Sequence, residues 1–186
     1  KDEFVRLRYR AVAAYFEGAY LFGNAKYHLA RVQEVVPDDP MLLFYSGALH
    51  EAYASERIQS VFDTLPPGTK QAPSARPEEQ WRKAERFFGE ASQAKGPVEA
   101  RIRRARVLGL LGRHAEAVVI LRDVRSLLTD DRLRYLGALF LGTEEGALGR
   151  MADARTAFER SATLYPTAQS PLIAMAELAR RTGDRP

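Results

Sequence analysis

The sequence of 186 residues contains no cysteine, one tryptophan and one asparagine. Without cysteine, the chain has no disulfide framework, no thiolate nucleophile and no cysteine-based zinc site. It also lacks an apolar run near the roughly 18 uncharged residues that a membrane-spanning helix needs. The chain begins at Lys1 without a hydrophobic targeting segment, as expected of a fragment of a longer protein or of a mature region whose signal was removed. The cellular compartment therefore stays open.

Sequence motifs of catalysis and of metal or cofactor binding are also missing. The scattered histidines are His28, His50 and His114. None belongs to the His-Glu-x-x-His spacing of zinc proteases, and no glycine-rich loop is followed by Lys-Ser or Lys-Thr. Adjacent carboxylates occur at Asp38-Asp39, Asp130-Asp131 and Glu144-Glu145. The first two pairs precede expected helices, where capping and the helix dipole account for acidic residues. The third pair has no partner visible in the sequence, so we expect no enzyme, metal or cofactor.

The residues that are present predict an all-α chain. Ala, Leu, Arg and Glu dominate, apolar residues recur at spacings of three and four, and sustained strand-like alternation is missing. Proline and glycine divide the chain into segments one helix long. These breaks are at 37–40, 66–77, 96–97, 112, 129–131, 149 and 166–171. The high ratio of arginine to lysine, with abundant alanine and glycine, indicates a GC-rich bacterial genome.

One pattern of small and large residues recurs along the chain. In the segment 149–166, a glycine is followed by Ala154, Phe158 and Ser161, and the segment ends at a proline. The equivalent positions of three earlier segments are Ala25, Leu29 and Val32; Ala84, Phe88 and Ala91; and Ala117, Leu121 and Val124. In three of the four segments another small residue lies twelve positions before the alanine: Ala13 before Ala25, Ala105 before Ala117 and Gly142 before Ala154. Small residues let two helices approach, and larger ones fill the space beside them, so this pattern predicts a chain of repeated helix pairs.

The last of these units resembles the tetratricopeptide repeat (TPR) family, a helix-turn-helix of about 34 residues. The matching residues are Leu141, Gly142, Gly149, Ala154, Phe158 and Pro166. Two departures stand out: the leading Trp of the family pattern is missing from every copy, and Glu145 replaces its Tyr. The interval from Ala25 to Ala84 exceeds one repeat by about 25 residues, which predicts an insertion in the second unit. Its proline-rich part, at about 63–77, is expected to be a surface loop, either without a role or in contact with a partner.

The resemblance implies a single domain over 1–186, a right-handed superhelical solenoid of about four TPR-like units with a C-terminal capping helix. The units are expected at about 2–36, 40–94, 98–128 and 132–165, and the capping helix at about 169–182. In this family the first helix of each unit lines a concave groove. The family pattern implies partner-binding residues at Arg10, Glu17, Phe44, Tyr45, Glu99, Arg103, Arg106 and Phe140.

Arg103 and Arg106 lie three residues apart, so both guanidinium groups could hold one carboxylate or phosphate, while the aromatic residues could take apolar side chains of a peptide. Alternatively the arginines form a solvated helix face, and the aromatics are covered by the insertion or a neighbouring helix. Some family members hold chaperone tails with a clamp of asparagine, lysine and arginine residues along the groove. This chain has one asparagine, Asn24, at the expected turn into a second helix, so we expect no such clamp.

The net charge of +4 is concentrated in residues 96–128, which carry seven basic and three acidic side chains. A nucleic-acid binder normally has a wider basic stripe, so a local anion contact is the simpler interpretation. We expect a non-catalytic scaffold that binds a protein or peptide, with an acidic segment as a candidate partner and without a small-molecule substrate.

Two alternatives remain. The aromatic-rich first unit indicates self-association or neighbouring domains of a longer chain. The second is an anion- or nucleic-acid-binding repeat using Arg101, Arg103, Arg104 and Arg106, which point around their helix instead of along one face.

Overall fold

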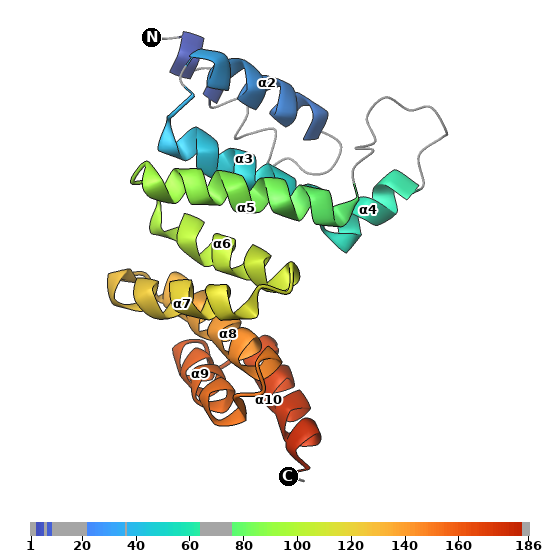
Figure 1. The fold of residues 1–186 in the computed structure, drawn as a ribbon, viewed down its shortest axis with the longest axis vertical. Helices are drawn as coiled ribbons and strands as arrows, with labels where there is room; N and C mark the ends of the chain where they lie inside the picture. Colours follow the sequence, from blue (N-terminus) through green and yellow to red (C-terminus); the bar gives the residue numbers. More distant parts are fainter. Residues whose placement is uncertain (1–2, 6, 9–21, 36, 64–75, 184–186) are drawn as a thin grey trace. The chain divides into compact units, whose positions relative to one another are not determined.

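The computed structural model describes residues 3–5, 7–8, 22–35, 37–63 and 76–183, and every regular element in these ranges is helical (Figure 1). The helices are α2 (Phe22–Val35), α3 (Pro40–Tyr53), α4 (Glu56–Asp63), α5 (Pro77–Gln93), α6 (Val98–Leu110), α7 (His114–Val124), α8 (Asp131–Ala147), α9 (Met151–Leu164) and α10 (Gln169–Thr182), with a 3₁₀ turn η2 (Arg125–Leu127) after α7. None of the described helices is long and apolar enough to cross a lipid bilayer. The predicted all-α fold is confirmed.

The chain divides into two compact units, residues 1–100 and 101–186, and the division falls inside α6. The single domain expected from the sequence stays a prediction. Most of the predicted proline-rich insertion, residues 64–75, lies outside the described residues, as do Arg10 and Glu17 of the predicted groove.

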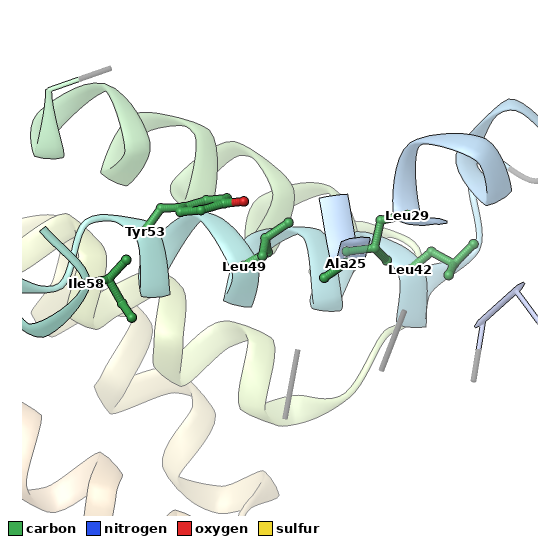
Figure 2. Close-up of a cluster of buried hydrophobic side chains, with 6 residues drawn as sticks. All are labelled: Ala25, Leu29, Leu42, Leu49, Tyr53 and Ile58. Carbon is green, nitrogen blue, oxygen red and sulfur yellow. The ribbon is translucent and has the colours of Figure 1, made fainter. Parts of the chain in front are cut away.

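In the first unit, α3 packs against α2 on one side and α5 on another. A hydrophobic core cluster of the first unit combines residues of three helices (Figure 2). It consists of Ala25 and Leu29 of α2, Leu42, Leu49 and Tyr53 of α3, and Ile58 of α4. The close approach of α3 and α5 depends on Gly47, because a Cβ atom there would lie 2.6 Å from the ring of Phe88.

Acidic caps start two of the helices at the positions where the sequence predicts them. The Asp39 carboxylate accepts hydrogen bonds from the backbone N–H groups of Met41 and Leu42, both at 3.0 Å. The Asp130 carboxylate accepts one from the N–H of Leu133 at 2.9 Å. Each bond satisfies a backbone donor that the first turn of a helix leaves unpaired. The capping role expected for these two carboxylate pairs is therefore confirmed at Asp39 and Asp130.

In the second unit, α8 packs against both α7 and α9, and α10 packs against α9. Gly112 and Gly149 end the turns before α7 and α9 with φ angles of 77° and 76°, in the left-handed region that favours glycine. Ala154 and Phe158 of α9 are buried with Leu178 of α10. The capping helix thus covers the apolar face of α9.

Candidate functional site

The predicted groove residues of the first unit lie on α3. Phe44 is only 9% exposed, and its ring centroid lies 5.9 Å from that of Phe88 on α5. The ring fills the interface between two helices, as the alternative of covering by a neighbouring helix predicts. A partner contact at Phe44 stays a prediction from the sequence. Tyr45 is half-buried, with its ring 5.6 Å from that of Phe44, and it packs against the cluster of Figure 2. Of these two side chains, only Tyr45 keeps a partly open surface.

The predicted residues on α6 and α8 include one pair that meets. Arg106 is exposed, and its guanidinium carbon lies 5.5 Å from the ring centroid of the half-buried Phe140. A cation at this distance over an aromatic face is attracted by the ring electrons. Glu99 and Arg103 lie on the same helix as Arg106 and are both half-buried. The second unit thus has a surface on which a cation and an aromatic ring lie side by side.

Glu145 forms a buried ionic cluster that sequence reasoning missed. The side chain is 1% exposed, and its carboxylate accepts hydrogen bonds from Arg122 Nη2 at 2.6 Å and Arg150 Nη1 at 3.1 Å. Arg122 also lies 3.5 Å from the carboxylate of Asp153. Since burying an unpaired carboxylate is costly, these arginines allow an acid at the position where the family pattern has tyrosine. The carboxylate connects α8 to α7 and to the turn before α9.

A cavity of about 410 Å³ lies beside this cluster, between α7, η2, α8 and α9. Its apolar lining comes from Leu121, Leu128, Ala138, Leu141 and Ala157. Four arginines from different elements also line it: Arg122, Arg125, Arg134 and Arg160. In the sequence, the sign of this basic cavity is the position of Arg122 and Arg125, one turn apart in the most basic window. Their convergence with Arg134 and Arg160 depends on helix packing.

A second buried carboxylate belongs to Glu144. The His114 ring nitrogen Nδ1 lies 2.6 Å from Glu144 Oε2, and Gly109 leaves room for the carboxylate because a Cβ atom there would collide with it. Burial raises the pKa of Glu144, and the hydrogen bond from His114 opposes that rise. Both members of the Glu144-Glu145 pair therefore have partners that were not visible in the sequence.

His50 also has a specific environment. Its Nδ1 donates to Gln80 Oε1 at 2.7 Å, and its ring stacks on Phe87 with centroids 5.5 Å apart. Burial lowers the pKa of His50, and the hydrogen bond to Gln80 opposes this effect only in part. Within the described ranges, no three histidine, aspartate or glutamate side chains converge to hold a metal ion.

Comparison with known proteins supports the fold. No protein-family model matches the sequence, and no curated protein sequence matches it. Among solved structures, the chain is similar to the crystal structure of a thermophilic TPR protein from Thermus thermophilus, with a TM-score of 0.50 and 16% sequence identity. The similarity covers 96% of this chain and 98% of that chain. At this identity it shows a TPR-like helical-repeat fold.

Proposed function

We propose that the chain is a non-catalytic scaffold of the TPR type, which binds a peptide carrying acidic and apolar residues on a surface formed by α6 and α8. The observation that carries this proposal is the position of Arg106 over Phe140. Helical-repeat folds present the faces of successive helices as extended binding surfaces. Acidic peptides are commonly held by arginine, and apolar anchor residues by aromatic rings.

The neighbouring residues support a mixed surface. Leu136 is half-buried and Thr143 is exposed on α8, at helical spacing from Phe140, while Arg103 lies one turn before Arg106 on α6. An apolar peptide side chain would pack on Phe140 and Leu136, and a carboxylate would pair with Arg103 and Arg106. The partner contacts expected at Tyr45 and Glu99 stay predictions from the sequence.

The charge distribution favours this function over binding of nucleic acid. Arg101, one of four arginines considered for phosphate contacts, pairs with Asp123 of α7. It is therefore directed to an internal partner, and the basic surface of α6 is narrower than its sequence indicates. A narrow basic surface matches a few carboxylates better than a phosphate backbone.

A fluorescein-labelled peptide of alternating Glu and Leu residues tests the proposal by fluorescence anisotropy. The double variant Arg103→Glu with Arg106→Glu is expected to lose binding, because both cations become anions. The matched control is Arg82→Glu with Arg86→Glu, two exposed positions on α5, which should bind as the wild type does. Circular dichroism checks that each variant keeps its helix content. Equal binding by the wild type and the Arg103/Arg106 variant would overturn the proposal.

Self-association is a second candidate function, supported by one exposed apolar pair. Leu172 and Ile173 of α10 are 51% and 66% exposed. Adjacent exposed aliphatic side chains favour contact with another apolar surface. If they join two copies of the chain, Ile173→Asp will convert a dimer into a monomer in light scattering. A monomeric wild type would exclude this function.

A further inference from the structure

The cavity of the second unit faces away from the surface proposed for peptide binding. Consecutive residues of an α-helix are rotated by about 100° around its axis. Phe140 and Thr143 therefore project from one side of α8, whereas the cavity-lining residues Ala138, Leu141 and Glu145 project from the opposite side. The two surfaces share a helix but no side chain, so the cavity is a separate site from that of the proposed function.

The apolar lining of the cavity is well fixed. Leu121 and Leu128 of the segment from α7 to α8, and Ala138 and Ala157 of the α8–α9 pair, are buried in their helix interfaces. Leu141 is half-buried and completes the apolar part. Because interior side chains are closely packed, these lining residues keep the shape of the cavity in the absence of a ligand. The apolar part of a ligand could occupy it without rearrangement of the core.

Two of the four lining arginines are engaged with other groups. Arg122 donates to Glu145 at 2.6 Å and lies near Asp153. Arg134 Nε donates to the backbone carbonyl of Leu128 at 2.8 Å, and its Nη1 donates to Asp131 at 3.0 Å. Their charges are thus largely compensated by groups of the protein itself.

The other two arginines are Arg125 of η2 and Arg160 of α9. Both are exposed at the cavity, and within the part of the chain that the structure describes neither has a hydrogen-bond or ion-pair partner. The two carboxylates of the lining, Glu145 and Asp153, are already next to Arg122. The cavity therefore has an excess of positive charge beside an apolar lining.

We propose that this cavity binds a carboxylate attached to an apolar group. The apolar group packs against Leu121, Leu141 and Ala157, and the carboxylate pairs with Arg125 and Arg160. The volume of about 410 Å³ suits a small organic acid or the last residue of a peptide, since small-molecule sites span roughly 300–1,000 Å³. Both sources offer the same chemistry, a carboxylate next to an alkyl or aromatic group. A cation would be repelled by these two arginines, so the site discriminates by charge.

A pair of fluorescent probes tests the charge requirement on the full chain. Anilinonaphthalene sulfonate has an apolar body and an anion that stands in for the carboxylate, and phenylnaphthylamine has the same body without a charge. We expect saturable binding of the sulfonate and much weaker binding of the neutral probe. Equal affinity for the two probes would overturn the proposal, because it would reduce the site to an apolar surface.

Variants locate the binding. Arg125→Gln with Arg160→Gln should lower the affinity for the sulfonate probe about tenfold or more, since charge-assisted hydrogen bonds are roughly twice as strong as neutral ones. The control Arg155→Gln with Arg180→Gln removes the same charge outside the cavity lining and should leave the affinity unchanged. Thr156→Trp, at the exposed edge of the lining, should block the probe by filling the cavity. Unchanged affinity for the sulfonate in a fully folded Arg125/Arg160 variant would overturn the proposal.

Competition separates the two sources of carboxylate. Decanoate and a short peptide ending in leucine are each titrated against the bound sulfonate, with the amidated peptide as the uncharged control. Displacement by decanoate alone supports a free organic acid, and displacement by the free-carboxylate peptide but not its amide supports a peptide terminus. Displacement by neither would overturn the proposal. Because the Arg103/Arg106 variant should keep this binding, failure here is distinguishable from failure of the proposed function.

Discussion

The ring of Phe158 occupies the space in which a side chain on Gly142 would begin, since a Cβ atom there would lie 2.5 Å from Phe158 Cδ1. The same relationship joins Gly47 and Phe88 in the first unit, where the corresponding distance is 2.6 Å. In both hairpins a glycine of the first helix receives a phenylalanine of the second. The repeat found in the sequence is therefore a repeat of one packing contact.

Gly142→Ala should destabilise the protein by about 1–3 kcal/mol, because the added methyl group must displace the Phe158 ring in a packed interface. Urea unfolding followed by circular dichroism measures the loss. Gly146→Ala is the control on the same helix, since its Cβ atom would lie an ordinary 3.7 Å from Ala154 Cβ. It should be neutral or more stable by up to about 1 kcal/mol through helix propensity. Equal losses of stability in the two variants would contradict this packing role of Gly142.

The Glu145 cluster should respond differently to loss of its acid and loss of its bases. Arg122→Gln with Arg150→Gln leaves a buried carboxylate without its cations, and we expect the free energy of unfolding to fall by about 1–3 kcal/mol. Glu145→Gln leaves only two partly exposed arginines, which water can solvate, so the free energy of unfolding should fall less in this variant. Chemical denaturation of both variants gives the comparison. A larger loss for Glu145→Gln would contradict the assigned roles.

His50 should make stability depend on pH. Its pKa is lowered from the ordinary 6.5, mainly by burial, so the unfolded chain takes up a proton more readily than the folded one. The resulting contribution to stability is present above pH 6.5 and is lost as the pH falls through the folded-state pKa. Proton NMR titration of the imidazole gives that pKa, and unfolding at several pH values gives the slope.

The variant His50→Gln tests this assignment, since glutamine does not titrate and can still bond to Gln80. It should lose the His50 part of the pH dependence, whereas His28→Gln should retain it. An NMR titration that puts the pKa of His50 at or above 6.5 would refute the prediction.

Ala154→Arg should unfold the hairpin of α8 and α9. Ala154 is fully buried, and an arginine there would both overpack the interface and bury a charge, at a cost of at least about 3 kcal/mol. Hydrogen exchange of the α9 amides measures the local effect. Ala152→Arg, two residues earlier and exposed, is the control and should remain folded. A fully protected α9 in the Ala154→Arg protein would argue against the repeat assignment.

The sequence predicted features that depend on local geometry and on period. Asp39 and Asp130 cap helices, and Gly112 and Gly149 form turns, because the backbone near each residue imposes these roles. The small residue Gly142 and the large residue Phe158 were also visible, because their spacing recurs along the chain. The right-handed superhelix stays a prediction, as do the boundaries of its units.

Tertiary structure decided which side chains meet. Phe44 is buried against Phe88, and the carboxylate of Glu145 is paired with Arg122 and Arg150. Arg125 and Arg160 line one cavity. Sequence periodicity determines which residues share a face of a helix, and therefore which face is buried. The neighbours of that face depend on how helices rotate and cross as they pack, and those are choices that side chains distant in the sequence make together.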